Sequence, residues 1–380
     1  MLKRLYIDNF RALVNTDLAL ERRTLLMGAN GTGKSTFADV LLRLQWLISG
    51  ISKTDEIFTS DTLTRWQNVP RQRFELDVTG SGGDYHYEVV VEHRKTASAE
   101  EPRTRIVREV LKTDSDPLFH FEEGLVHLYR DDHSAGPEYP FDWGRSALGT
   151  ITPRGDNQKL TWFVRWLRGL TVLRPNPPGM LDLVERDDFL IAVDTRNFAA
   201  WYHMASSGDK RHDRQLHDDL VDVLPGFDAL NFEAAGPNRW LLRADFSRSG
   251  EKVMLRFGEL SDGQRALILL YAVARFLLPE GRTVLLDEPD NYVSLDEIQP
   301  WLLSVTDIVD GGSGQLVLVS HHPEIFNQWA ESHGTVAERE SCGPIRTRKF
   351  SSAPGVELLP AEAVARGWTG ASGAGGNGSQ

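Results

Sequence analysis

The sequence predicts an α/β fold, and three short apolar segments that each lead into a polar loop carry that prediction. These segments are Thr24–Met27, Thr283–Leu286 and Gln315–Val319, each of a length suited to a buried strand. The stretch after the first segment is amphipathic, and its apolar face consists of Phe37, Val40, Leu41, Leu44, Leu47 and Ile48. Buried strands combined with amphipathic helices are typical of an α/β domain.

The loop after the first strand predicts a phosphate-binding site. It matches the pattern G-x-x-x-x-G-K-[ST] in full, with Gly28, Ala29, Asn30, Gly31, Thr32, Gly33, Lys34 and Ser35. Backbone N–H groups of such a loop surround phosphates, and the helix that opens near Gly33 directs its positive end at them. We expect Lys34 to reach the β and γ phosphates and the Ser35 hydroxyl to bind Mg²⁺. The predicted ATP-binding loop ends at Thr36.

The second half of the chain carries further motifs in a recognisable order. The segment Leu260-Ser261-Asp262-Gly263-Gln264 resembles the LSGGQ signature of ATP-binding-cassette (ABC) ATPases, and a mostly apolar helical run, Ala266–Leu278, follows it. Next come the strand that ends in two carboxylates, the segment Ser294–Asp296, and the strand that ends at Ser320-His321-His322. Their order is similar to that of Walker B, the D-loop and the switch histidine, which implies a P-loop NTPase with an ABC-type head.

The residue types in these motifs suit ATP hydrolysis. Asp287 stands where a carboxylate would hold Mg²⁺, usually through water, and Glu288 is placed to orient and deprotonate the attacking water. His321 would stabilise charge at the γ phosphate, as a neutral donor or as an imidazolium. The alternative interpretation of Asp287 and Glu288 is a strand-terminal turn at Pro289. The alternative for His321 is a core or surface histidine without a catalytic role. His322 is interpreted as a bystander.

The resemblance to ABC ATPases also implies a homodimer. In those proteins the signature completes the ATP site of a second head, so Ser261 and Gly263 would act across an interface. The predicted nucleotide-contacting residues of this half are Ser261, Gly263, Gln264 and Asp296. Because the chain has one phosphate-binding loop and one signature, two copies related by a two-fold axis would build complete sites. Asp262 departs from the transporter signature, and the longer interval from Glu288 to Asp296 makes the D-loop match less secure.

Further segments resemble the RecF and overcoming-lysogenization-defect group of bacterial AAA-family ATPases. They are Leu5–Arg11, which follows the opening I-x-N-F-[RK] shared with SMC proteins, and Arg174–Pro177, Asp194–Tyr202, Leu224–Phe227 and Asp290–Leu295. The resemblance implies that Asn9, Phe10 and Arg11 contact the base, although a strand with Phe10 in the core explains them equally well. Gln67 and Gln72 are both candidates for the Q-loop glutamine, and a solvated loop residue is the alternative for each.

The motif positions predict how the chain is organised. Residues 1–50 and 236–368 would form the ATPase head, and residues 51–235 an insertion with an antiparallel β lobe to about 155 and a helical lobe beyond it. The insertion has no sustained heptads, which argues against long coiled-coil arms. Residues 369–380 are rich in Gly and Ser and predict a disordered tail. We also expect no Toprim nuclease domain after His321.

The composition indicates the cellular compartment of the protein and the kinds of partner it can bind. The chain has 380 residues, 41% of them hydrophobic, and a single cysteine, Cys342, which predicts a cytoplasmic protein without a membrane segment. A net charge of −12 argues against a general electrostatic attraction to DNA, which stays possible as a partner. A modest positive cluster is nevertheless present, and it could form a local basic surface. The alternative interpretation is an amphipathic helix with a solvated charged face. The cluster consists of Arg154, Lys159, Arg165, Arg168 and Arg174.

Together these observations predict an enzyme that hydrolyses ATP to ADP and phosphate in an ATP-sandwich dimer. By family resemblance it would be the regulatory or motor subunit of an anti-phage or genome-maintenance system, working with a separate effector such as a nuclease. One alternative is a RecF-like repair ATPase that binds DNA. Another is a nucleotide-gated scaffold with little turnover, which the presence of Glu288 disfavours.

Overall fold

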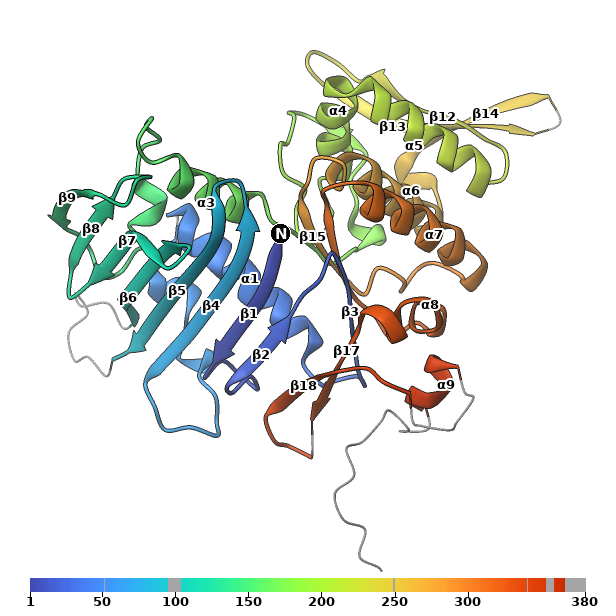
Figure 1. Cartoon of the computed structure of the whole chain (residues 1–380). Helices are drawn as coiled ribbons and strands as arrows, with labels where there is room; N and C mark the ends of the chain where they lie inside the picture. Colours follow the sequence, from blue (N-terminus) through green and yellow to red (C-terminus); the bar gives the residue numbers. More distant parts are fainter. Residues whose placement is uncertain (51, 95–103, 249, 340, 353–358, 366–380) are drawn as a thin grey trace, which may run out of the picture.

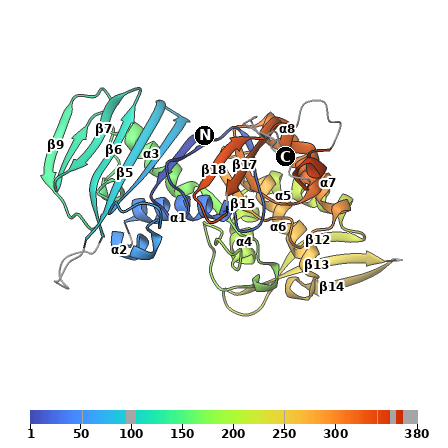
Figure 2. The same ribbon diagram turned by 90° about the horizontal axis from the view of Figure 1, so that it is seen from below.

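Helix α1 (Lys34–Ser49) packs between two sheets that meet near the middle of the molecule (Figures 1 and 2). The structure is a computed structural model, and it describes the chain except for residues 51, 95–103, 249, 340, 353–358 and 366–380. The predicted tail therefore lies outside the described residues. Gly50 ends α1 in the left-handed conformation, with φ of 71°, and donates its N–H to the carbonyl of Leu47.

The first sheet contains the strands that the sequence predicts. Its order is β10 (Thr171–Leu173), β15 (Thr283–Asp287), β16 (Gln315–Val319), β3 (Arg23–Met27), β17 (Gly334–Arg339) and β18 (Ile345–Lys349). Neighbouring strands run parallel, except that β18 is antiparallel to β17. Every residue of β15 and β16 is buried, as in a parallel sheet that is covered on both faces.

Alternate side chains of the parallel strands enter two different cores. Leu286 and Leu318 point into one core, whereas Leu285 and Val319 point into the other. The first core is filled by helices α4 (Phe198–Gly208), α5 (Lys210–Val223), α6 (Asp262–Leu277), α7 (Leu295–Gly311) and α8 (Pro323–His333). The second holds α1, α3 (Gln158–Gly169) and the other large sheet (Figure 2). The predicted α/β fold class is confirmed.

The other large sheet is antiparallel and has eight strands. Its order is β2 (Thr16–Ala19), β1 (Leu2–Asp8), β4 (Arg71–Gly80), β5 (Gly83–His93), β6 (Thr104–Thr113), β7 (Asp116–Glu122), β8 (Leu125–Tyr129) and β9 (Ala135–Pro140). Strands from the predicted β lobe thus pair with β1, which comes before the phosphate-binding loop. The short helix α2 (Thr54–Ile57) packs against β6.

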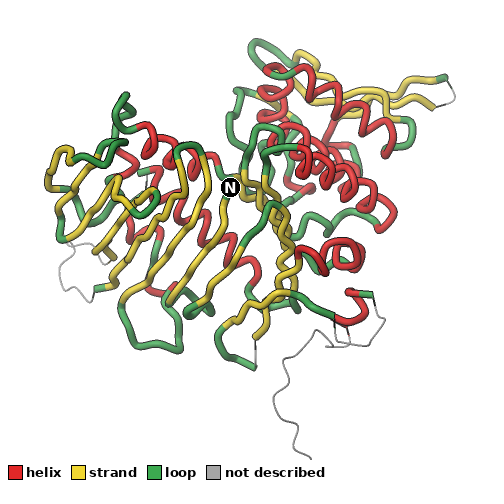
Figure 3. The backbone as a smooth tube through the Cα atoms, viewed as in Figure 1, coloured by secondary structure: helices red, strands yellow, loops and turns green. Residues whose placement is uncertain are grey.

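The helical segment predicted from 156 to 235 also contains strands. Besides α3, α4 and α5 it includes β10, β11 (Leu183–Val184) and β12 (Phe227–Ala234), and the last two join a small sheet with β13 (Trp240–Arg248) and β14 (Glu251–Arg256) (Figure 3). The hydrophobic pattern of the sequence does not predict β10, because three residues directly after a helix are too few to show the alternation of a strand. Helix α9 (Pro360–Ala365) lies against α8.

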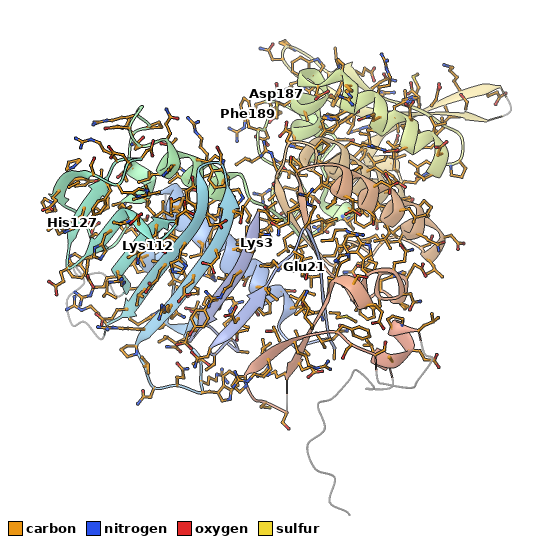
Figure 4. All side chains as sticks on the ribbon, in the orientation of Figure 1. Lys3, Glu21, Lys112, His127, Asp187 and Phe189 are labelled. Carbon is orange, nitrogen blue, oxygen red and sulfur yellow. The ribbon has the colours of Figure 1, made fainter. Side chains whose placement is uncertain are left out.

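The face of the antiparallel sheet that points away from the core carries charges of both signs. Arg73 lies 3.5 Å from Glu88, and Arg108 lies 3.3 Å from Glu122, across neighbouring strands. Figure 4 labels Lys112 and His127 on the same sheet, and His127 Nδ1 is 2.8 Å from Glu138 Oε1. Because opposite charges pair here, this face does not form a basic surface for a polyanion.

The basic cluster predicted around residues 154–174 divides among different contacts. Helix α3 buries Leu160, Phe163, Val164 and Leu167, so it is the amphipathic helix of the alternative interpretation. The guanidinium of Arg168 donates to the carbonyl of Gly149 at 2.8 Å, whereas Arg174 contacts a carboxylate of the parallel sheet. Arg168 and Arg174 are thus separated from the cluster by these contacts, whereas Arg154, Lys159 and Arg165 line one cavity of about 500 Å³.

The structure assigns the residues after β1 to the interior. Phe10 and Asn9 are both fully buried, and the Asn9 amide donates to the carbonyls of Val69 and Arg71 at 2.7 Å. The base contacts predicted for Asn9 and Phe10 are wrong for this conformation, because a fully buried side chain presents no surface to a ligand. Arg11 stays partly exposed and pairs with Asp39 at 2.5 Å.

Neither candidate for the Q-loop glutamine lies at the parallel sheet. Gln72 is fully buried and donates to the carbonyls of Asn9 and Thr62, at 2.9 and 3.0 Å. Gln67 donates to Asp8 Oδ1 at 3.1 Å. Both side chains therefore brace the loops beside the antiparallel sheet.

A buried carboxyl group in this core makes stability depend on pH. Burial raises the pKa of Glu109 to about 7, although Tyr87 and Ser146 each donate a hydrogen bond of 2.7 Å to its Oε1. The unfolded chain releases this proton near 4.5, the ordinary pKa of a glutamate, and the folded chain near 7, so stability falls as pH rises through that window.

Between pH 4.5 and pH 8 the wild type is therefore expected to lose roughly 3 kcal/mol of its free energy of unfolding. The Glu109→Gln variant should not show this loss, because glutamine has no proton to release. The measurement is denaturant unfolding of both proteins across this pH range. Glu123→Gln, at an exposed side chain, is the control. An equal pH dependence for wild type and Glu109→Gln would contradict the prediction.

Among the described residues, no helix combines the length and the apolar character needed to cross a membrane.

Candidate nucleotide-binding site

Three polar loops meet at the carboxyl ends of β3, β15 and β16. Parallel neighbours end at the same edge of a sheet, so the residues after Met27, Asp287 and Val319 come together. Backbone hydrogen bonds join them, since Glu288 N donates to Val319 O at 2.8 Å and Ser320 N donates to Leu26 O at 3.3 Å. Motifs that lie almost 300 residues apart in the sequence thereby form one edge.

The phosphate-binding loop needs its glycines for steric reasons. At Gly28 φ is 152°, and an added Cβ would lie 2.3 Å from the carbonyl oxygen of Ala337 in the neighbouring strand. At Gly33, the N-cap of α1, φ is 83°, and a Cβ would lie 2.3 Å from Ile345 Cδ1. Thr32 closes the turn by donating its hydroxyl to Ala29 O at 2.8 Å.

Lys34 lies folded over its own loop. Its Nζ donates to the carbonyls of Gly28 at 2.8 Å and Ala29 at 3.1 Å, and the residue is 5% exposed. Burial lowers the pKa of Lys34, while the charges of Glu288 and Asp287 act to raise it. The Lys34 ammonium thus lies inside the curve of the loop, where two backbone carbonyl oxygens accept its hydrogen bonds. The oxygens of a phosphate could replace these acceptors.

Ser35 and Asp287 form the pair predicted to hold the metal ion. The Ser35 hydroxyl donates to Asp287 Oδ1 at 3.0 Å, and the Asp287 side chain is 2% exposed. Two hard oxygens at this distance suit Mg²⁺, which takes few protein ligands and completes its shell with phosphate and water. In the described part of the chain, no group of three or more His, Cys, Asp or Glu side chains that could hold a metal ion is present.

Glu288 stands next to His321 at the same edge. Glu288 adopts a positive φ of 53°, which is uncommon outside glycine and occurs often at functional sites. Asn291 Nδ2 donates to Glu288 Oε2 at 3.1 Å, and His321 Nδ1 lies 3.9 Å from Oε1. Both side chains are partly exposed, at 35% and 45%, so both can reach a ligand. Burial raises the pKa of the neighbouring Asp290.

His322 has a structural role instead. Its Nδ1 accepts from Glu324 N at 3.2 Å and so caps helix α8. This contact agrees with its interpretation as a bystander.

The signature residues lie at the start of α6. Ser261 caps this helix, because its hydroxyl accepts from Gln264 N at 3.2 Å while Gln264 Oε1 accepts from Ser261 N at 3.0 Å. Asp262 pairs with Arg265 at 2.5 Å, and a Cβ on Gly263 would lie 3.0 Å from Tyr292 O. Helices α6 and α1 pack on opposite faces of the parallel sheet. The signature residues at the start of α6 therefore lie on the other face of the sheet from α1, the helix that follows the phosphate-binding loop.

The remaining predicted residues are solvent-exposed, with the exception of Thr36. Asp296 is exposed in the first turn of α7, and Ala29, Asn30 and Gly31 are exposed in the phosphate-binding loop. Thr36 is half-buried in the first turn of α1. A cavity of about 590 Å³ opens beside the loop and is lined by His321, Phe326, Val336, Arg339 and Ala361, among others. The structure thus gathers the Lys34, Ser35, Asp287, Glu288 and His321 group and leaves the signature and Asp296 apart from it.

Sequence reasoning missed one residue at this edge. The Arg174 guanidinium lies 2.8 Å from Asp287 Oδ2 through both Nε and Nη2. The available signal was a basic residue directly after the apolar triplet of β10, but nothing in the sequence paired β10 with β15.

The parallel sheet, with the phosphate-binding loop at its carboxyl edge, is similar to the ABC-type P-loop fold of ATPase heads. The family described as "AAA domain, putative AbiEii toxin, Type IV TA system" matches residues 195–327. An Smc head bound to the C-winged helix domain of ScpA is similar in structure, with a TM-score of 0.58 and 11% identity over 92% of this chain and 98% of that one.

A second similar structure is an Smc head with an extended coiled coil, derived from Pyrococcus furiosus and bound to the C-terminal domain of ScpA. Its TM-score is 0.50 at 11% identity, covering 92% of this chain and 96% of that one. No curated protein sequence matches this chain. At these identities the similarity establishes the fold.

Proposed function

We propose that this protein binds ATP with Mg²⁺ and hydrolyses it to ADP and phosphate. The observation that supports the proposal best is the 3.0 Å contact between Ser35 and Asp287, with Glu288 and His321 beside it at the same sheet edge. A metal-binding pair, an exposed carboxylate and a histidine are the groups that phosphoryl transfer to water requires. They come from three separate loops, which argues against a chance surface cluster.

In this proposal each side chain has a distinct task. Lys34 leaves the carbonyls of its loop and binds the β and γ phosphates, and the N–H groups of residues 29–36 surround them. Ser35 and Asp287 hold Mg²⁺, which neutralises charge on the phosphates. Glu288 orients the attacking water and accepts its proton, and His321 stabilises charge at the γ phosphate. Asn291 keeps the Glu288 carboxylate in place through its 3.1 Å hydrogen bond.

We propose further that the complete site forms between two copies of the chain. At the N-terminus of α6, on the opposite face of the sheet from α1, Ser261 is exposed and Gly263 is half-buried. Such a helix end can bind the γ phosphate of a facing copy, with Gln264 and Asp296 at the same interface. The exposure of Asp296, Asn30 and His321 supports this arrangement, because each could reach a facing surface.

The biological role that we propose follows family resemblance and needs a second polypeptide. Both similar Smc heads are bound to parts of ScpA, so heads of this fold can carry a partner. By analogy, this chain would be a RecF-like or overcoming-lysogenization-defect-like ATPase of an anti-phage or genome-maintenance system, regulating a separate effector. A RecF-like DNA-binding role predicts steeply salt-dependent DNA binding that requires ATP, and a scaffold role predicts ATP binding without turnover.

Lys34→Ala tests the proposed function. Since the variant loses the ammonium that would bind the phosphates, ATP affinity is expected to fall about tenfold to a hundredfold and phosphate release with it. Isothermal titration with ATP and Mg²⁺ measures the first effect, and a steady-state phosphate assay measures the second.

Lys210→Ala, at an exposed lysine of α5, is the control for loss of a positive charge. Wild-type protein that neither binds ATP nor releases phosphate would refute the proposed function. Equal ATP affinity in wild type and Lys34→Ala would refute the role of Lys34.

A further inference from the structure

Arg174 reaches the Mg²⁺-binding carboxylate because of the register of one strand pair. Strand β10 is an edge strand parallel to β15, and Leu173 lies opposite Leu286. The next residue on each strand is therefore Arg174 or Asp287, at the carboxyl end of the sheet. The backbone itself places a guanidinium beside the carboxylate, and Arg174 N is fixed by a hydrogen bond of 2.6 Å to Val193 O.

The two oxygens of Asp287 have different partners. Oδ1 accepts from the Ser35 hydroxyl at 3.0 Å, while Oδ2 accepts from Arg174 Nε at 2.8 Å and also lies 2.8 Å from Nη2. The Asp287 side chain is 2% exposed, so its charge needs a partner, and Lys34 gives its hydrogen bonds to backbone carbonyls instead. Arg174 is thus the cation that compensates Asp287 in this conformation.

Arg174 also has room to move and a second acceptor nearby. Its side chain is 50% exposed and lines a cavity of about 520 Å³ together with Asn176, Val193 and Arg196. Its Nη2 lies 4.0 Å from Asp39 Oδ1 on α1, a carboxylate whose other oxygen, Oδ2, accepts from Arg11. A guanidinium that leaves Asp287 would therefore reach Asp39 by a small rotation of its side chain.

We infer that Arg174 is a tethered cation that holds Asp287 when the site lacks metal and moves away when Mg²⁺ binds. The inference rests on the proposed ATP site and adds a positioning residue to it. Guanidinium and Mg²⁺ compete for the same carboxylate, so Arg174 raises the Mg²⁺ concentration that the site needs. In the absence of metal, Arg174 lessens the repulsion between ATP and the carboxylates of Asp287 and Glu288.

If this competition occurs, Arg174→Gln should change two measured quantities, the metal-free affinity for nucleotide and the Mg²⁺ concentration at half-saturation. Without magnesium the variant is expected to bind a non-hydrolysable ATP analogue about threefold to tenfold more weakly than the wild type, because Asp287 is then uncompensated. The midpoint of a Mg²⁺ titration at fixed analogue concentration is expected to fall by a similar factor, because the competing cation is gone. A purely structural salt bridge would not produce these opposite shifts.

The experiment uses fluorescence or calorimetric titration of the full chain, first in EDTA and then with increasing MgCl₂. Arg196→Gln is the matched control, because Arg196 lines the same cavity but pairs with Asp194 at 3.7 Å. Arg174→Lys keeps the charge and should restore most of the metal-free affinity. Asp39→Asn removes the negative charge of the second acceptor and should raise the Mg²⁺ midpoint, the reverse of the shift in Arg174→Gln.

The outcomes separate this inference from the proposed function. If the wild type binds the analogue but Arg174→Gln, folded by circular dichroism, shows the same metal-free affinity and the same Mg²⁺ midpoint, the inference is overturned and the ATP site stands. If Arg174→Gln does not fold, Arg174→Lys and Asp39→Asn decide the question through their own midpoints. A wild type that binds no analogue under either condition overturns both.

Discussion

Glu288→Gln is expected to lower the rate of phosphate release by about a hundredfold to ten-thousandfold while leaving ATP binding intact. Glutamine keeps the shape of the side chain and can still bond with Asn291, which lies 3.1 Å from Glu288 Oε2, but it cannot accept a proton from water. The substitution therefore removes the base without removing the phosphate and metal contacts of Lys34 and Ser35. Steady-state phosphate release and ATP titration measure the two quantities separately.

Glu324→Gln is the matched control for this result. Glu324 lies three residues after His321, but its carboxylate accepts from Gln299 and Gln328, at 3.1 and 2.9 Å, and not from groups at the sheet edge. Its loss should leave turnover close to that of the wild type. Wild-type turnover in Glu288→Gln would remove Glu288 from the mechanism, and weakened ATP binding would show that it acts on the ground state.

Ser261→Arg is expected to prevent ATP-dependent dimerisation. In the Glu288→Gln background, Mg²⁺ and ATP should trap a dimer, since bound ATP is not consumed and stabilises the associated state. Arginine at Ser261 places a long side chain where the facing copy would bring its γ phosphate, so the double variant should stay monomeric or dissociate at least about tenfold more readily. Multi-angle light scattering with and without ATP measures the mass of each species.

Loss of the helix cap has to be separated from the added bulk. Ser261 caps α6, and its removal costs about 1 kcal/mol of stability on that ground alone. Asp209→Arg is the matched control, because Asp209 caps α5 by accepting from Arg211 N and His212 N. Dimers that form equally in both variants would rule out the proposed role of Ser261, and a mass independent of ATP in all variants would rule out a nucleotide-driven sandwich.

The sequence by itself determined the fold class and the parts of the site that are contiguous along the chain. The loop from Gly28 to Ser35 could be identified because its glycines, lysine and serine act through their fixed spacing and their own backbone. The carboxylates Asp287 and Glu288 could be located because an apolar run directly before them predicts the end of a buried strand. In each case the physical cause lies within a few residues of the motif.

The tertiary structure alone decided which distant residues meet. Arg174 contacts Asp287, 113 residues further along the chain, through the pairing of β10 with β15, and no periodicity in the sequence specifies that register. Asn9 and Phe10 match a ligand-binding pattern yet are buried, and Glu109 has a raised pKa, because burial depends on what packs over a residue from elsewhere in the chain. Contacts and desolvation of this kind are properties of the packed chain, whereas motif chemistry is a property of the local sequence.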